Sequence, residues 1–210
     1  MARTADSFQR RSAKYKPQPR VLVICEDTKS SKIYFEEASR HYRAHAKVQF
    51  SHSGKTDPLG IVTAAIQQAQ NFDHIYCVID RDSHNQKNFE AAQSIGQSNQ
   101  SKITVLTSYP CFEFWLLLHF GYTRSPFVPS GGKSAADNVL NELKTKHEMS
   151  SYAKGNVAGL FNKLLPTLSG AQTNALRTLR DSASDGEMNP STPLHELIAK
   201  LEELGKLKPI

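Results

Sequence analysis

Three acidic residues stand where apolar, strand-like runs give way to polar loops. Glu26 follows the run 21–25, and Asp80 and Asp82 follow the run 74–79. Ligands of open parallel sheets collect outside the carboxyl ends of the strands, so these carboxylates converge if their strands are neighbours. Such close carboxylates repel one another unless a cation neutralises them, and Mg²⁺ prefers a few carboxylates together with waters and phosphate oxygens. The spacing predicts a Mg²⁺ site suited to phosphodiester chemistry, in which Mn²⁺ can substitute.

Two further residues are candidates for the same site. Glu113 lies three residues after Pro110, near the start of an apolar helix that follows the fourth predicted strand. It could hold a second metal ion, or it could be an ordinary first-turn acid that the helix dipole favours. Lys29 lies in the loop after Glu26, where its ammonium group could contact the scissile phosphate or remain solvated. Arg81 should point away from the two aspartates, which favours a structural ion pair over catalysis.

The elements that would position these residues alternate between strand and helix. Short apolar runs rich in β-branched residues predict strands at 20–25, 47–51, 74–79 and 103–107. Helical periodicity and capping residues predict helices that start at Ser30 or Ser31, at Asp57-Pro58, near Gln86 and at Pro110. Four β/α units predict an α/β fold with a parallel four-stranded sheet, flanking helices and right-handed crossovers.

Composition divides the chain into three predicted parts. Residues 1–19 form a basic N-terminal tail, and residues 20–122 contain the β/α units. Residues 123–210 form a helical C-terminal appendage packed on that domain, because Pro, Gly and Ser become frequent after Thr123 and helical patterns follow. The last helix is predicted to begin at Thr192-Pro193, with an apolar stripe of Leu194, Leu197, Ile198 and Leu201.

The formal charge of +6 is concentrated in the tail. Residues 1–20 carry six basic residues against Asp6 alone, so the rest of the chain is close to neutral. Such an arm, with Arg10 and Arg11 as candidates, either strengthens nucleic-acid binding by neutralising phosphates or is a solvated tail. Lys133, at a predicted helix start, and Lys154 are further candidates for phosphate contacts, with solvated positions as the alternative.

Several other classes of protein find no support in the sequence. The strongly apolar stretch 112–118 is far shorter than the roughly 20 residues that cross a bilayer, and no secretory signal is evident. We therefore expect a cytoplasmic protein that does not contact membranes. The three cysteines lack C-x-x-C spacing and should be buried free thiols. The segments 54–56 and 132–134 lack the first glycine of a P-loop, which argues against ATP hydrolysis by this chain.

Several motifs occur together in a specific order. They are the segments 24–29, 34–35, 78–82, 108–115, 152–155 and 189–195. In this combination the chain resembles the RloB-like family of Toprim proteins over about residues 20 to 205. Two positions depart from the family pattern: Asp27 stands where glycine usually follows the glutamate, and Tyr109 stands where asparagine commonly precedes the Pro-Cys pair. Asp27 adds a negative side chain that could alter either metal affinity or the conformation of the turn.

This resemblance implies a Toprim metal site and a nuclease-like protein of prokaryotic defence loci. Such proteins are often encoded beside an ABC or SMC-like ATPase that acts as sensor or regulator. We therefore expect a Mg²⁺-dependent endonuclease effector of anti-phage defence that acts on DNA or RNA, with tRNA among the options. The alternative is a non-catalytic adaptor or regulatory subunit of such an ATPase, in which the acidic site is vestigial.

Overall fold

The computed structural model describes residues 19–81 and 86–206, and it has the predicted α/β fold. A parallel sheet with the strand order β2-β1-β3-β4 lies at its centre. Its strands are β1 (Val21–Cys25), β2 (Val48–Ser51), β3 (His74–Asp80) and β4 (Ile103–Ser108). Because β1 pairs with β2 on one side and with β3 on the other, the strand order reverses between β1 and β3. Open α/β sheets bind ligands at such switch points.

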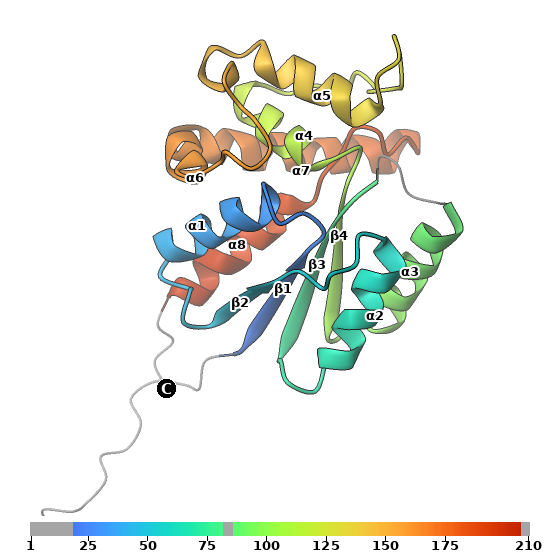
Figure 1. Ribbon diagram of the computed structural model, residues 1–210, viewed down its shortest axis with the longest axis vertical. Helices are drawn as coiled ribbons and strands as arrows, with labels where there is room; N and C mark the ends of the chain where they lie inside the picture. The colour runs from blue at the N-terminus through green and yellow to red at the C-terminus, as the bar shows by residue number, and fades with distance from the viewer. Residues whose placement is uncertain (1–18, 82–85, 207–210) are drawn as a thin grey trace, which may run out of the picture.

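Helices cover both faces of the sheet (Figure 1). One face carries α1 (Ser31–His41) and α8 (Leu194–Gly205), and the other carries α2 (Pro58–Gln68) and α3 (Gln86–Ser98). Alternate residues of β1 point to opposite faces of the sheet. Val21, Val23 and Cys25 pack in the core under α1 and α8. Leu22 and Ile24 pack in the core under α2 and α3. A strand buried on both faces explains why this run is apolar throughout.

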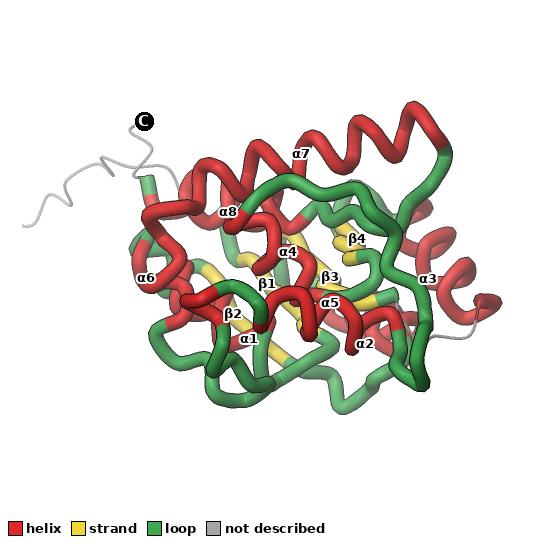
Figure 2. The backbone as a smooth tube through the Cα atoms, turned by 90° about the horizontal axis from the view of Figure 1, so that it is seen from above, coloured by secondary structure: helices red, strands yellow, loops and turns green. Residues whose placement is uncertain are grey.

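A layer of helices lies over the carboxyl end of the sheet. Figure 1 shows α4, α5 and α7 above the strands, and the view from above in Figure 2 shows α4 and α5 crossing in front of them. This layer comprises α4 (Phe112–Leu117), α5 (Ala135–Lys144), α6 (Leu160–Leu164) and α7 (Leu168–Asp185), with short 3₁₀ turns at Leu118–Phe120, His147–Met149 and Leu165–Thr167. The predicted helical C-terminal part is therefore present.

After α7 the chain returns to the sheet. Helix α8 contacts α1 and β4, and all four residues of its predicted stripe, Leu194, Leu197, Ile198 and Leu201, are fully buried. These residues belong to the same apolar core as β1 and α4. The last helix of the predicted appendage thus completes the cover of the sheet, while the boundary at residue 123 stays a prediction.

One helix start differs from its sequence prediction, and another lies where predicted but lacks a side-chain cap hydrogen bond. Ser30 is the N-cap of α1 but makes no side-chain cap hydrogen bond. Helix α4 begins at Phe112 with Cys111 as its N-cap, and Pro110 precedes it after a cis peptide bond with Tyr109. The predicted cap of α2 is present, because the Asp57 carboxylate accepts a hydrogen bond from the Gly60 N–H at 2.8 Å.

The cysteines and the apolar helices also bear on predictions from the sequence. All three cysteines are buried and free, as their apolar surroundings indicated. Within residues 19–81 and 86–206, no helix has both the length and the apolar character needed to cross a bilayer.

His119 is buried where α1 meets the helical layer, with 6% of its surface exposed. Its Nε2 lies 3.4 Å from the Tyr34 hydroxyl, and its Nδ1 lies 3.0 Å from Thr167 Oγ1. The Trp115 ring packs edge-on against it. Burial lowers the pKa of His119 to about 4, so the neutral imidazole is part of the packing.

Acidification should destabilise the protein through His119. The unfolded chain protonates this residue near its usual pKa of 6.5, and the folded chain only near 4, so stability is lost as the pH falls through that window. The shift corresponds to about 3 kcal/mol. His119→Gln cannot take up this proton. Its free energy of unfolding, measured with urea, should therefore change less than that of the wild type between about pH 7 and pH 4.5. Equal pH dependence of the two proteins would contradict the assignment.

Candidate functional site

Glu26 and Asp80 meet at the carboxyl ends of β1 and β3. In the parallel ladder Cys25 lies opposite Val78, and the Glu26 N–H continues the ladder by donating to the Val78 carbonyl at 3.0 Å. The Asp80 N–H donates to Glu26 Oε2 at 3.0 Å. The Glu26 carboxylate thus lies across the end of β3. Asp82, the third member of the predicted cluster, lies outside the described residues.

Glu113 approaches the same place from the first turn of α4. Its side chain is 1% exposed. Tyr152 donates a hydrogen bond to Glu113 Oε1 at 3.0 Å, and Lys154 Nζ lies 3.4 Å from the same oxygen. Glu113 Oε2 is buried, and among the described residues it has no hydrogen-bond partner. A buried carboxylate oxygen without a partner is costly, so this oxygen fits a bound cation or water.

We call Glu26, Asp80 and Glu113 the acidic edge, and its charges repel one another. Burial, followed by the charges of Glu113 and Glu26, raises the pKa of Asp80 well above its usual range. Burial opposes the charged form of Lys154, but neighbouring negative groups, Glu113 foremost, outweigh it and raise the pKa of Lys154. The ammonium group therefore stays charged beside the carboxylates. A hard divalent cation would relieve the remaining repulsion.

The chemistry of the donor groups favours Mg²⁺ or Mn²⁺ over Zn²⁺. A site of carboxylates alone suits a hard cation, whereas zinc sites usually include thiolate or imidazole ligands. The nearby Cys111 thiol is an unsuitable ligand, because burial and then the charges of Glu113 and Asp80 raise its pKa well above the usual range. Within the described ranges, however, no group of three or more His, Cys, Asp or Glu side chains is arranged to hold a metal ion. Metal binding by Glu26, Asp80, Asp82 and Glu113 stays a prediction.

Asp27 caps the turn between β1 and α1. Its Oδ1 accepts a hydrogen bond from the Lys29 N–H at 2.7 Å, and its Oδ2 accepts from Ser30 and Ser31 at 2.7 and 3.0 Å. Backbone N–H groups at a helix start stabilise a carboxylate. Asp27 therefore fixes the turn, and it does the capping that the sequence had suggested for Ser30 or Ser31.

The predicted basic residues occupy different places. Lys154 contacts the acidic edge through Glu113. Lys29 is exposed on the Asp27 turn and packs beside Gly155, where an added methyl group would lie 3.9 Å from Lys29 Cβ. Lys133 is exposed ahead of α5, whose first turn is closed by a reciprocal hydrogen-bonded pair of Ser134 and Asp137. Arg10 and Arg11 lie outside the described residues. Lys29 and Lys154 are thus the two candidates that the fold brings near each other.

Sequence reasoning did not identify the partners that hold this site together. Tyr152 reaches Glu113 across 39 residues of sequence. The Tyr109 backbone pairs with that of Ser191 through hydrogen bonds of 2.8 and 3.1 Å, and the hydroxyl of Ser108 lies 2.9 Å from that of Thr192. The motifs 108–115, 152–155 and 189–195 therefore meet in space. Their joint occurrence was the available signal, but it did not show which residues touch.

Comparison with known proteins identifies one matching family. The family model described as RloB-like protein matches residues 21–201, which is most of the chain. No curated protein matches the chain, and no solved structure does.

Asp27→Ala should destabilise the protein, because three backbone N–H groups lose their acceptor. We expect the free energy of unfolding, measured with urea, to fall by about 1–3 kcal/mol. Asp27→Asn keeps one acceptor oxygen and should lose less. An unchanged free energy of unfolding in Asp27→Ala would show that the carboxylate is not needed as a cap.

Mg²⁺ or Mn²⁺ should raise the thermal unfolding midpoint of the wild-type protein and leave that of Asp80→Asn unchanged, because a ligand stabilises only the state that binds it. In EDTA, Asp80→Asn should unfold at a higher temperature than the wild type, since one of the crowded charges is gone. Glu202→Gln is the matched control, because Glu202 is partly exposed on α8 and pairs with Lys206. A full metal response in Asp80→Asn would contradict the site.

Proposed function

The chain belongs to the RloB-like family, and we propose that it is a metal-dependent endonuclease that hydrolyses phosphodiester bonds in nucleic acid. The acidic edge carries this proposal. Glu26 and Asp80 meet at the switch point of the sheet, and Glu113 adds a buried oxygen that has no hydrogen-bond partner among the described residues. Clustered carboxylates with one open oxygen suit a hard cation, and such cations serve phosphoryl chemistry.

In this proposal Glu26, Asp80 and Asp82 hold Mg²⁺, and Glu113 Oε2 supplies a further ligand or binds a second ion. The bound ion would neutralise charge on the phosphate and activate an attacking water. Tyr152 holds Glu113 in place by its hydrogen bond to Oε1, which leaves Oε2 available. The chain thus holds Glu113 in place without a metal ion.

Two lysines would bind the phosphate. The Lys154 side chain is 48% exposed although its ammonium group lies 3.4 Å from Glu113 Oε1. It can therefore touch the acidic edge and a substrate oxygen at the same time. Lys29, on the neighbouring turn, would supply a second positive charge. Cations beside the carboxylates let a polyanion approach an edge that would otherwise repel it.

The wider setting in this proposal comes from what the family resemblance implies. The protein would be an effector of anti-phage defence in the cytoplasm, controlled by an ABC or SMC-like ATPase. Its substrate would be DNA or RNA, including tRNA. Arg10, Arg11 and Lys133 would strengthen binding through phosphate contacts that carry no sequence information.

One observation favours a second candidate, a non-catalytic adaptor of such an ATPase. The Lys154 ammonium already offsets part of the charge on Glu113 without a metal ion. In an adaptor the acidic edge would be a structural remnant, and the protein would bind the ATPase without cutting nucleic acid.

Cleavage assays should separate the two candidates. With Mg²⁺, the full-length protein should cut labelled DNA, RNA or tRNA, alone or with its ATPase. Asp80→Ala should reduce cleavage to background, and Glu113→Gln should slow it by about 10- to 100-fold, because each loses a carboxylate of the acidic edge. Glu202→Gln should cut like the wild type, and circular dichroism should confirm that every variant is folded.

Cleavage by Asp80→Ala at the wild-type rate would refute the assigned site. A wild-type protein that binds the ATPase but cuts no substrate with Mg²⁺ or Mn²⁺ would establish the adaptor.

A further inference from the structure

A hollow of about 300 Å³ opens beside the acidic edge, and we call it the Tyr109 hollow. Its lining includes Arg81, Tyr109, Phe127, Val128, Met188 and Asn189. Arg81 directly follows Asp80, and its N–H donates to the carbonyl oxygens of Ser108 and Pro110 at 3.0 and 2.9 Å. The hollow is therefore built on the same strand ends as the acidic edge. Its volume lies at the lower end of the range for small-ligand sites.

Two of the lining residues that face solvent are large and apolar, although the lining also contains the exposed acidic residue Glu187. Val128 is 56% exposed and Met188 is 40% exposed, and both belong to the hollow. Exposed large apolar side chains that cluster in a pocket are typical of ligand-binding sites. Ile66 and Leu176 are the other exposed large apolar residues of the described chain, and neither lines this hollow.

An aromatic and a cationic group stand together at one side of the hollow. The Tyr109 ring packs edge-on against Phe89, with 6.0 Å between ring centroids. The Arg81 guanidinium carbon lies 4.7 Å from the centre of the same Phe89 ring. Phe89 thus supports both groups from behind. A flat ring beside a guanidinium is the combination that proteins use to stack bases and hold nucleic-acid backbones.

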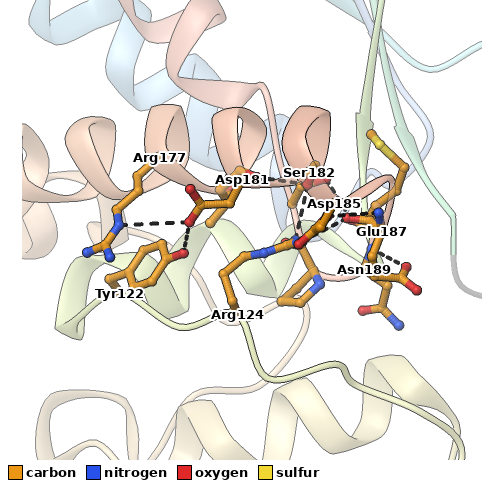
Figure 3. Close-up of polar contacts among 12 residues, drawn as sticks. Tyr122, Arg124, Arg177, Asp181, Ser182, Asp185, Glu187 and Asn189 are labelled. Atoms are coloured by element: carbon orange, nitrogen blue, oxygen red, sulfur yellow. Dashed lines mark hydrogen bonds and ion pairs between the residues drawn. The ribbon is translucent and has the colours of Figure 1, made fainter.

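Polar contacts fix the part of the lining that the segments 127–129 and 187–189 form (Figure 3). The Arg124 guanidinium donates to the carbonyl oxygens of Glu187 and Pro190 at 2.9 and 2.7 Å and to the Asp185 carboxylate at 2.7 Å. The Asn189 amide donates to the Phe127 carbonyl at 2.7 Å. The segment 127–129 and the segment 187–189 are therefore held together before any ligand binds, which lowers the entropy cost of binding.

We infer that the Tyr109 hollow receives one unpaired nucleobase, which stacks on Tyr109 while the adjoining phosphate lies at the acidic edge. The inference rests on the proposed nuclease function and adds the class of substrate. A base in a duplex is stacked on its neighbours and cannot enter, so the substrate is single-stranded nucleic acid or an unpaired nucleotide in a folded one. The apolar wall of Val128 and Met188 contacts the remaining face and edge of the base.

Binding without cleavage tests the inference. Full-length protein in EDTA is titrated into single-stranded oligonucleotides of about ten nucleotides that carry 2-aminopurine, whose fluorescence falls on stacking. We expect saturable quenching, about tenfold weaker binding by Tyr109→Ala and near wild-type binding by Tyr109→Phe. The duplex form should show no such quenching. Deoxyribose and ribose versions of the same oligonucleotide separate DNA from RNA as the source of the base. Unchanged binding and quenching in Tyr109→Ala would overturn the inference.

A second pair of variants avoids the Tyr109 backbone, which is paired with Ser191. Val128→Glu places a negative charge in the hollow, and Ile66→Glu places the same charge at a similarly exposed aliphatic position outside it. Val128→Glu should reduce quenching and weaken binding by about tenfold, whereas Ile66→Glu should behave like the wild type. Equal effects of the two changes would refute a specific role for the hollow.

Cleavage measured separately distinguishes the two proposals. Quenching that depends on Tyr109, in a protein that cuts nothing with Mg²⁺, supports the base site and counts against the nuclease. Cleavage that Asp80→Ala abolishes and Val128→Glu leaves unchanged supports the nuclease and overturns the base site.

Discussion

β1 and β3 are the two central strands, and their parallel pairing decides where the charged groups of the protein meet. Both strands end at the same edge of the sheet, so Glu26, which follows β1, and Asp80, which ends β3, are neighbours. The hydrogen bond from the Asp80 N–H to Glu26 is the first contact beyond the regular ladder. The fold thus places negative charges close together, and neighbouring groups must offset the repulsion between them.

Compensation for that repulsion comes from two kinds of group. Backbone N–H groups at the start of α1 stabilise Asp27, which keeps its charge directed into the turn. Tyr152 and Lys154 stabilise Glu113 from a loop of the helical layer. For Asp80, burial and then the charges of Glu113 and Glu26 outweigh the nearby Lys154 ammonium, so its pKa is raised well above the usual range. This crowding of negative charge is the reason for proposing a metal ion at the acidic edge.

Local patterns in the sequence predicted the elements well because burial leaves a readable pattern: an apolar face on a helix, or a continuous apolar run in a strand that is buried on both faces. The uninterrupted apolar run of β1, the Asp57 cap and the α8 stripe are all readable over a few residues. Glu26 and Asp80 could be placed at one edge by the same logic. The Tyr152–Glu113 contact and the Tyr109–Ser191 bridge depend on the path of the helical layer, which no short window encodes. Ser30 was the wrong side-chain cap, because Asp27 reaches three N–H groups at once.

The position of α8 has a consequence for synthesis. This helix follows every other described element in the chain, yet it covers the same face of the sheet as α1. As the chain leaves the ribosome, β1 and α1 emerge first, and their apolar surface stays uncovered until residues near Leu201 have been made. Contacts so distant in sequence slow folding and expose intermediates to aggregation. The nascent chain therefore keeps this apolar surface uncovered until α8 has been made.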